Sequence, residues 1–301
     1  MVLEHDKLPV IETLQESKRF LVQAVAHQGM RTVIKKAKMP PMRVNLEHEL
    51  QAYRLYEQLT QDPDCPFNIA SVLEFGDDWV LLSYLEGQPM SEIVTDETKQ
   101  VMYDRLADIM AFCDNRIGIT IDGERMPQNA QQISIREAHV SITLALLDTL
   151  ENFDAGFLME RLETVAEKFL ENHNELETAF VNPDLTPPHV MINGADVAIF
   201  DFENARIDGA RFADLINFAT KIVFVEGDVN RAKNFFDRFW QSKGESCEPY
   251  LQQLKTLMYQ RCLGFTTELI TEPNEIHNTS LEMNAEYARN IDAVIRWADS
   301  L

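Results

Sequence analysis

Two aspartates, Asp184 and Asp201, are the side chains of this sequence best placed to do chemistry. Each lies beside a short apolar run that reads as a β-strand, and an Asn193-Gly194 turn separates the two runs. One carboxylate can orient an attacking hydroxyl, and the other can hold Mg²⁺ on the phosphates of a nucleotide. The pattern predicts phosphoryl transfer, with Asp184 as the catalytic residue and Asp201 as a metal ligand.

His189 and Glu203 lie close to these aspartates in the sequence. His189 follows Asp184 by five residues and is expected to be a second metal ligand, although an imidazole there can also pack or hydrogen-bond within the loop. Glu203 lies two residues after Asp201 and is placed to assist it.

A lysine and a glutamate in the first 50 residues are suited to bind the phosphates of the same nucleotide. Lys35 ends a β-branched strand, Thr32-Val33-Ile34-Lys35, whereas Lys36 lies on the opposite face of the strand. A strand lysine held by a helix glutamate is a common way to direct an ammonium at nucleotide phosphates. Glu49, in the helix that follows, is preferred over Glu47 as the partner of Lys35, although the sequence alone does not decide between them.

These side chains need a sheet and a helix to position them. Residues 21–26 and 32–36 predict a hairpin around Gly29, and Asn45 is expected to cap a helix that runs to about residue 59. Two further strands are predicted at 71–75 and 79–84, before a break at Gly87. The backbone of Ser83 and Leu85, where the last strand ends, is expected to bind the purine of the nucleotide.

The remainder of the chain reads mostly as amphipathic helices, because apolar residues recur at spacings of three and four. The predicted helices span 96–115, 134–152, 157–175, 212–226, 229–243, 248–270 and 282–301. This order predicts an α+β, two-lobed fold, with a small β-rich N-lobe over residues 1–84 and a larger, mainly helical C-lobe over 85–301.

Charge and hydropathy restrict the partners. The chain of 301 residues carries a formal net charge of −22, which argues against nucleic acid as a partner. The acidic balance suits a cationic substrate, or serves only to keep the surface soluble. No apolar run approaches the roughly 20 residues of a membrane helix, and no signal peptide is evident, so no membrane partner and a cytoplasmic location are expected. Its four cysteines form no CxxC pair, so neither zinc nor a disulfide framework is indicated.

Taken together, these motifs resemble the aminoglycoside phosphotransferase/choline kinase family. Its catalytic loop reads His-Gly-Asp-Leu-x-Pro-x-Asn-Val-Leu, its metal loop reads Ile-Asp-Trp/Phe-Glu, and an Asp-Leu-Ala follows. The matching residues are Asp184, Leu185, Pro187, Val190, Asp201, Phe202, Glu203, Asp214 and Leu215. The resemblance implies a protein-kinase-like fold, ATP or GTP as co-substrate, Mg²⁺, and a small hydroxyl-bearing substrate. Asp214 is expected to cap a helix and to hold the catalytic loop.

The sequence departs from the family pattern at three places. Asn182 and Pro183 replace the histidine and glycine that precede the catalytic aspartate, and His189 replaces the metal-binding asparagine. The N-lobe also has no glycine-rich loop, because Gly29 is alone in the first 75 residues. These departures keep an alternative open, which is a nucleotide-binding pseudokinase or scaffold of the same fold with little or no transfer activity.

Overall fold

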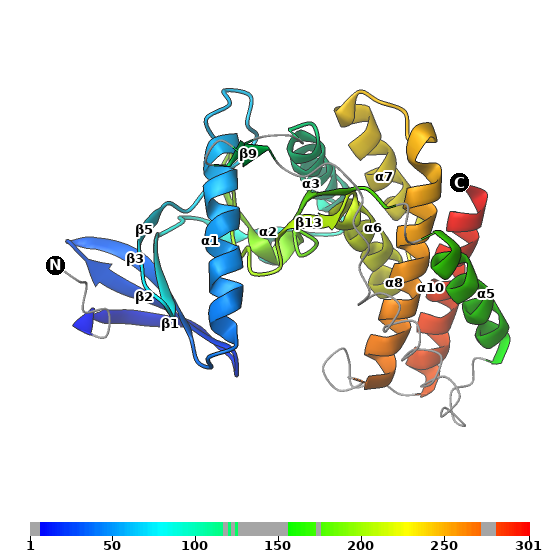
Figure 1. Cartoon of the computed structure of the whole chain (residues 1–301), viewed down its shortest axis with the longest axis horizontal. Helices are drawn as coiled ribbons and strands as arrows, with labels where there is room; N and C mark the ends of the chain where they lie inside the picture. The colour runs from blue at the N-terminus through cyan, green and yellow to red at the C-terminus, as the bar shows by residue number, and fades with distance from the viewer. Residues whose placement is uncertain (1–6, 117–119, 122–123, 126–155, 173–175, 272–280) are drawn as a thin grey trace. The chain divides into compact units, whose positions relative to one another are not determined.

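The computed structural model describes residues 7–116, 120–121, 124–125, 156–172, 176–271 and 281–301 (Figure 1). The chain forms two compact units. Unit 1 comprises Met1–Met102, Arg116–Met126 and Asp184–Ile207, and unit 2 comprises Tyr103–Asn115, Pro127–Pro183 and Asp208–Leu301. The units are interleaved along the sequence, and a division of the chain between residues 84 and 85 stays a prediction.

A two-residue turn joins the longest strands of unit 1. β2 (Phe20–His27) pairs antiparallel with β3 (Met30–Ala37), and His27 lies opposite Met30. Gln28 and Gly29 between them have φ angles of 51° and 78°. A tight hairpin turn needs left-handed φ at both positions, and glycine meets this requirement without strain. The hairpin predicted around Gly29 is confirmed.

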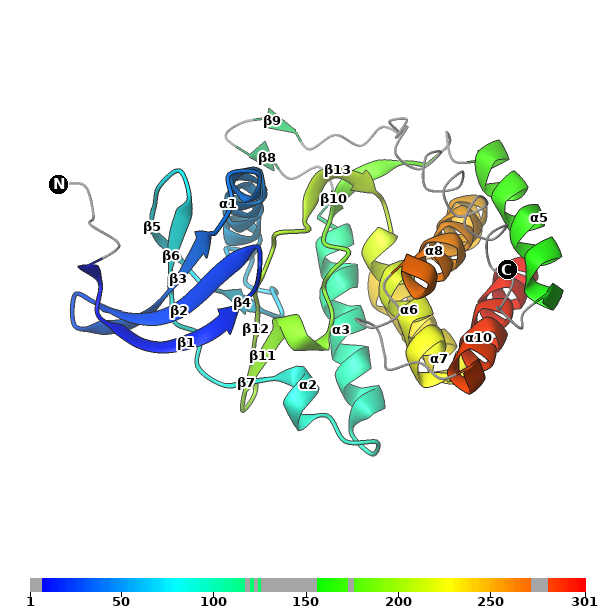
Figure 2. The same cartoon turned by 90° about the horizontal axis from the view of Figure 1, so that it is seen from below.

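This hairpin belongs to a five-stranded antiparallel sheet with the order β1-β2-β3-β6-β5 (Figure 2). β5 (Val72–Phe75) and β6 (Trp79–Ser83) agree with the predicted strands. β1 (Val10–Glu16) was not predicted, and all of its residues are exposed. An edge strand that buries no side chain has no reason to show the alternation by which strands are found in sequences.

Helix α1 (Met42–Leu59) packs against this sheet. Its buried side chains, which include Leu46, Glu49 and Tyr53, recur at spacings of three and four. The predicted cap at Asn45 is wrong, because Pro41 is the N-cap residue and Asn45 lies inside the helix. Proline has its φ fixed near the helical value and is well suited to the start of a helix, so α1 begins about one turn earlier than predicted.

Four short strands form a second sheet of unit 1, in the order β4 (Asn68–Ile69), β12 (Asp196–Ile199), β11 (Val190–Asn193) and β7 (Gln88–Pro89). β11 and β12 are the apolar runs predicted beside the two aspartates. Gly87, just before β7, has a φ of 123°, and a Cβ there would lie 2.4 Å from the Ile192 carbonyl oxygen. Only glycine allows the chain to pass this close to β11. Unit 1 also contains α2 (Met90–Ile93) and the pair β8 (Thr120–Ile121) and β9 (Glu124–Arg125).

Unit 2 is mainly helical. It contains most of α3 (Lys99–Asp114), and α5 (Gly156–Asn172), α6 (Ala213–Glu226), α7 (Val229–Lys243), α8 (Leu251–Thr271) and α10 (Leu281–Ser300). All six agree with predicted helices, whereas the one predicted at 134–152 lies outside the described residues. The Phe224 and Phe265 rings stack between α6 and α8 at 4.3 Å. β10 (Thr178–Val181) pairs with β13 (Arg206–Ala210), along which the chain enters unit 2.

The fold is therefore α+β, with an antiparallel sheet in the N-terminal part and a mainly helical C-terminal part, as predicted. None of the helices in the described ranges is both long and apolar enough to cross a bilayer.

Candidate active site

Lys35 is a buried lysine of unit 1. It lies on β3 opposite Val80 of β6, and it is only 6% exposed. Its ammonium lies 2.9 Å from Oε2 of Glu49, a residue of α1 that is 1% exposed. Glu47 is exposed on the same helix. The structure therefore pairs Lys35 with Glu49, the partner preferred from the sequence.

Two further carboxylates surround the same ammonium. Lys35 Nζ lies 2.7 Å from Asp201 Oδ1 and 3.3 Å from Glu203 Oε2. Glu203 also contacts Arg19, with 3.1 Å between Oε1 and the guanidinium. Asp201 has a φ of 63°, a left-handed backbone that a side chain other than glycine adopts only at a cost. The loop after β12 is thus held in a strained conformation that directs Asp201 at Lys35.

The charges of this cluster shift each other's pKa. Burial would lower the pKa of Lys35, but the carboxylates of Glu49, Asp201 and Glu203 outweigh it and raise that pKa above its ordinary value. Burial would raise the pKa of Asp201, but Lys35 brings it below its ordinary value. For Glu49 burial dominates over Lys35, and its pKa is raised. Lys35 and Asp201 are therefore firmly charged at neutral pH.

Asp184 and His189 lie on the loop that leads into β11. A 3-10 turn at Pro187–His189 begins after Thr186, whose carbonyl accepts a bond from the His189 N–H at 2.9 Å. His189 Nδ1 lies 2.7 Å from the Asp184 carbonyl oxygen, and Nε2 lies 3.8 Å from Asp201 Oδ2. The Asp184 side chain is 36% exposed. A ligand can therefore reach its carboxylate, and His189 lies between the two aspartates.

Asn204 is a site residue that the sequence reasoning missed. Its amide Nδ2 donates to Asp184 Oδ2 at 3.1 Å. The bond ties the loop of Asp184 to the loop of Asp201, since Asn204 follows Asp201 by three residues. The available signal was a polar amide just after Asp-Phe-Glu, but only the fold shows which carboxylate it meets.

The backbone at the end of β6 is partly engaged within the protein. The Ser83 N–H donates to the Ser71 carbonyl at 2.9 Å, and the Ser83 hydroxyl accepts from the Ser71 N–H at 2.8 Å. The N–H of Ser83 is therefore already used within the protein, and contact of the Ser83 carbonyl with a purine stays a prediction. Leu85 lies beyond the strand and is half-buried, and its contact with a nucleotide stays a prediction.

The residues before Asp184 belong to unit 2. Asn182 is 1% exposed, and within the described part of the chain neither polar atom of its side chain has a hydrogen-bond partner. The Asn217 amide of α6 donates to the Pro183 carbonyl. Asp214 instead accepts from the Leu215 N–H at 2.9 Å, and Phe212 is the N-cap residue of α6. The expectation that Asp214 caps the helix and holds the catalytic loop is corrected, because the bond to this loop comes from Asn217.

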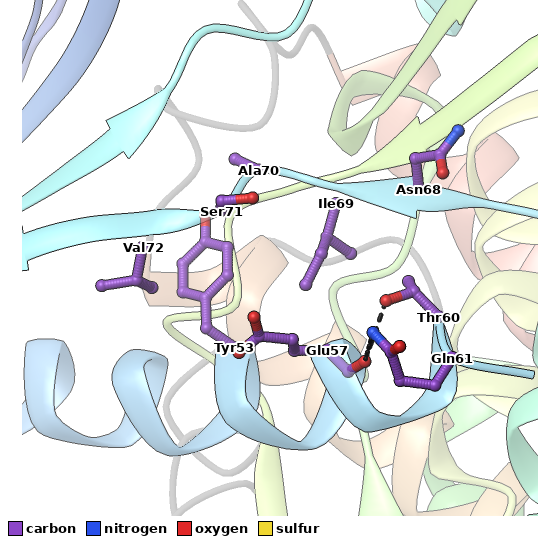
Figure 3. Close-up of a pocket in the computed structure, with 9 residues that line it drawn as sticks. All are labelled: Tyr53, Glu57, Thr60, Gln61, Asn68, Ile69, Ala70, Ser71 and Val72. Carbon is purple, nitrogen blue, oxygen red and sulfur yellow. Dashed lines mark hydrogen bonds between the residues drawn. The ribbon is translucent and has the colours of Figure 1, made fainter.

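A cavity of about 260 Å³ lies elsewhere in unit 1, between the second half of α1 and the segment around β4 (Figure 3). Its lining residues are Tyr53, Glu57, Thr60, Gln61, Asn68, Ile69, Ala70, Ser71 and Val72. None of the predicted site residues lines it. The Tyr53 ring points across the cavity toward Ser71. It also contacts the ring of Phe202, with 4.7 Å between the two ring centroids. The cavity therefore adjoins the loop of Asp201 through one aromatic contact and is distinct from the candidate site.

The donor set of the site suits a divalent cation bound together with phosphates. Asp201 Oδ1 is taken by Lys35, so Oδ2 is the oxygen left for a cation, beside His189 Nε2. No cluster of three or more metal-binding side chains occurs among the described residues. Nucleotide-bound Mg²⁺ typically takes one or two carboxylates, with phosphate oxygens and water completing its shell. The residues present fit that arrangement.

Comparisons with known proteins agree with these observations. Residues 8–248 match the model of the "Phosphotransferase enzyme family". No curated protein matches the chain in sequence. Many solved structures resemble its fold, although their sequences are distant.

Three of these structures illustrate the likeness. The ADP-bound aminoglycoside phosphotransferase APH(2'')-Ib has a TM-score of 0.59 and 14% identity, over 97% of this chain and 96% of that one. The GDP complex of aminoglycoside 2'-phosphotransferase-IIIa has a TM-score of 0.62 and 14% identity, over 96% and 93%. Macrolide 2'-phosphotransferase MphH from Brachybacterium faecium has a TM-score of 0.57 and 16% identity, over 95% of each chain. The chain shares the kinase-like fold of these phosphotransferases.

Proposed function

The chain belongs to the phosphotransferase enzyme family, and from this premise we propose that it transfers the γ-phosphoryl group of ATP or GTP to a hydroxyl of a small molecule. The observation that carries the proposal is the cluster in which Glu49, Asp201 and Glu203 enclose the ammonium of Lys35. A buried lysine held by a helix glutamate, beside a carboxylate suited to a metal, is the arrangement that phosphoryl transfer needs.

Lys35 binds the α- and β-phosphates in this proposal, and Glu49 holds the lysine in position. The raised pKa of Lys35 keeps its ammonium charged, so Lys35 remains a cationic partner for the phosphates although three carboxylates surround it. Glu203 and Arg19 support the cluster from its other edge. The backbone of Leu85 contacts the purine.

Asp184 orients the acceptor hydroxyl and accepts its proton as the hydroxyl oxygen bonds to the γ-phosphorus, while the bond from this phosphorus to the bridging oxygen breaks and ADP or GDP leaves. Asn204 occupies Oδ2 of Asp184, so Oδ1 is the oxygen directed at the substrate. Asn204→Leu should lower kcat by about tenfold, the effect of losing one hydrogen bond to a charged group.

Asp201 and His189 are the residues that would hold a divalent cation, with Mg²⁺ as the expectation from the sequence. When bound, the ion neutralises the charge that develops on the β- and γ-phosphate oxygens.

The acceptor is proposed to be a small, hydroxyl-bearing, cationic molecule. A net charge of −22 concentrates cations near the protein surface. Related folds include proteins solved with aminoglycosides, as in the gentamicin complex of APH(2'')-IIa. Amino sugars therefore form the first group of acceptors to be screened.

Two measurements on the purified protein test the proposal. The first is the thermal shift with ATP or GTP, with and without Mg²⁺, because a nucleotide at about 100 times its Kd adds roughly 2.7 kcal/mol of stability. The second is phosphate incorporation into a panel of amino sugars and other alcohols. We expect a metal-dependent shift that is lost in Asp201→Asn, and transfer to at least one acceptor.

Asp184→Asn is the decisive variant. It should abolish transfer while nucleotide binding is largely kept, because the change removes the group that orients the hydroxyl and retains the shape of the side chain. Unchanged transfer in Asp184→Asn would overturn the assignment. Nucleotide binding without transfer to any acceptor would favour the alternative of a pseudokinase or scaffold.

A further inference from the structure

The tautomer of His189 is fixed by its surroundings. Nδ1 lies 2.7 Å from the carbonyl oxygen of Asp184, which can only accept a hydrogen bond. Nδ1 therefore carries the proton of the neutral ring, and Nε2 carries the lone pair. Histidines that bind metals commonly donate their other ring N–H to a carbonyl or carboxylate in this way, which fixes the orientation of the ring.

The lone pair on Nε2 faces one particular carboxylate oxygen. Nε2 lies 3.8 Å from Asp201 Oδ2, whereas Oδ1 of the same carboxylate is occupied by Lys35 at 2.7 Å. Two ligands that are each about 2.1 Å from one ion lie roughly 3 Å apart when adjacent and about 4 Å apart when opposite. One cation can therefore accept both Nε2 and Oδ2 with little movement of either side chain.

The ring is held in this position from two further sides. The His189 N–H bonds to the Thr186 carbonyl at 2.9 Å, which anchors the backbone of the 3-10 turn. The ring of Phe200 lies edge-on to the imidazole, with 6.0 Å between the ring centroids. A preorganised nitrogen ligand costs little reorganisation on binding and discriminates between metals more sharply than a mobile one.

We propose that this site selects a divalent transition-metal ion, Mn²⁺ in particular, over Mg²⁺. Mg²⁺ prefers a shell made of oxygens, whereas first-row transition ions bind imidazole well. Mn²⁺ accepts this nitrogen and still suits the oxygens of Asp201, phosphate and water that complete the shell. The inference rests on the proposed function only in that a nucleotide supplies the phosphate oxygens.

Metal binding in the presence of ADP tests the inference without reference to activity. Mn²⁺ affinity is read from the electron paramagnetic resonance signal of free Mn²⁺, and Mg²⁺ affinity from its competition with Mn²⁺. Pulsed measurements of ¹⁴N coupling report whether an imidazole nitrogen binds the ion. We expect ¹⁴N coupling in the native protein and tighter binding of Mn²⁺ than of Mg²⁺.

His189→Asn is the informative variant, because asparagine offers an oxygen in place of the nitrogen. The Mn²⁺-to-Mg²⁺ affinity ratio should fall by at least about tenfold, and the ¹⁴N coupling should disappear. His27→Asn is the matched control, because His27 Nε2 also lies near a carboxylate of unit 1, at 3.5 Å from Glu74. This control should leave both quantities unchanged. If His189→Asn does not fold, judged by its thermal melting, His189→Gln takes its place.

An unchanged affinity ratio in the His189 variant, or the absence of ¹⁴N coupling in the native protein, would overturn the inference. Transfer that works best with Mg²⁺, together with no ¹⁴N coupling, would leave the proposed function standing and the metal inference refuted. A ¹⁴N-coupled Mn²⁺ ion without transfer to any acceptor would support the metal inference and count against the proposed function.

Discussion

Each compact unit of this protein buries a group of charged side chains, and the two groups are built differently. The unit 1 cluster is Lys35 with Glu49, Asp201 and Glu203, so three carboxylates surround one ammonium. The unit 2 cluster is Arg211 and Lys243 around the buried carboxylate of Asp114, with the partly exposed Glu177 and Glu245 at its edge. Among the buried members, three carboxylates outnumber one ammonium in the first cluster, whereas two cations share one carboxylate in the second; the exposed Arg19 in the first, and Glu177 and Glu245 in the second, lie at the edges.

Hydrogen bonding follows the same contrast. Arg211 binds both oxygens of Asp114, at 3.0 and 3.1 Å, and its guanidinium lies over the rings of Phe212 and Tyr250. Lys243 adds bonds of 2.6 Å to Asp114 and 2.9 Å to Asn115. A buried charge costs least when opposite charges and hydrogen bonds surround it, as they do for Asp114. In the unit 1 cluster, Lys35 bonds to Oδ1 of Asp201, and Oδ2 lies 3.8 Å from Nε2 of His189; the proposed cation would bind at this oxygen.

Among variants of the two clusters, Lys35→Met should have the largest effect, and it acts on function. We expect kcat/KM for the nucleotide to fall by about 10²- to 10³-fold, because the phosphates lose a preorganised positive charge. Initial rates at subsaturating ATP measure the effect. Lys36→Met, on the opposite face of β3, is the control and should retain the native rate. Equal losses in both variants would contradict the special role of Lys35.

Asp114→Asn should have the next largest effect, and it acts on stability. Removing this carboxylate leaves Arg211 and Lys243 without their shared partner, which should cost about 3 kcal/mol of unfolding free energy. Urea unfolding measures the loss, and activity per folded molecule should be unchanged. Asp108→Asn is the control on the same helix, because the Asp108 and Arg238 side chains are 33% and 39% exposed and such pairs contribute less than about 1 kcal/mol. A loss of activity per folded Asp114→Asn molecule would contradict the assignment of a purely stabilising role to the unit 2 cluster.

The third prediction concerns pH and Asp214, a neighbour of the unit 2 cluster. Burial, with the charge of Asp114 adding to it, raises the pKa of Asp214 to about 7. The folded state then binds this proton more tightly than the unfolded state, whose pKa is about 4. The stabilising contribution of protonated Asp214 is therefore complete below about pH 4 and is lost as the pH rises through about 7, by about 2 kcal/mol for a side chain that keeps some exposure. Urea unfolding at pH 5 and pH 8 should show this difference in the native protein and lose it in Asp214→Asn.

Glu49→Gln should have the smallest effect, of opposite sign to that of Asp114→Asn. Burial raises the pKa of Glu49, so its ionised form costs stability as the pH rises through that pKa. The amide still offers Lys35 an oxygen, and we expect a gain of about 1 kcal/mol at pH 8 with a slower transfer reaction. If Glu49→Gln melts at a lower temperature than the native protein at pH 8, the ionised Glu49 does not destabilise unit 1.

The sequence predicts those parts of the fold that require a repeating apolar pattern or a glycine at a particular position. The hairpin around Gly29 and the break at Gly87 are predictable, because both positions need φ angles that only glycine adopts easily. The helices of unit 2 are predictable from apolar spacing. β1 shows no such pattern, since it is exposed along its whole length. The start of α1 is misplaced because a good capping residue, Asn45, follows shortly after a proline that begins the helix first.

The residues of the candidate site also divide into those that the sequence predicts and those that it does not. Lys35, Glu49, Asp184, His189 and Asp201 stand in motifs whose residue types and spacing suggest their chemistry. Asn204 and Asn217 stand in no such motif, because their contacts with Asp184 and Pro183 depend on how loops fold back. The engagement of the Ser83 N–H by Ser71 is equally invisible, since it depends on a strand pairing rather than on a side chain.

The interleaving of the units also constrains how the protein is made. Lys35 and Asp201 are 166 residues apart in the chain, whereas Lys35 and Glu49 are close neighbours in sequence. During synthesis the lysine can meet Glu49 early, but the rest of its cluster is absent until residues 184–207 have left the ribosome. Contacts of such long range are formed late and slowly. A nascent chain that has not reached Asp201 can therefore offer Lys35 only one of these three carboxylates, Glu49, and the other two follow β12 near the end of the unit 1 segments.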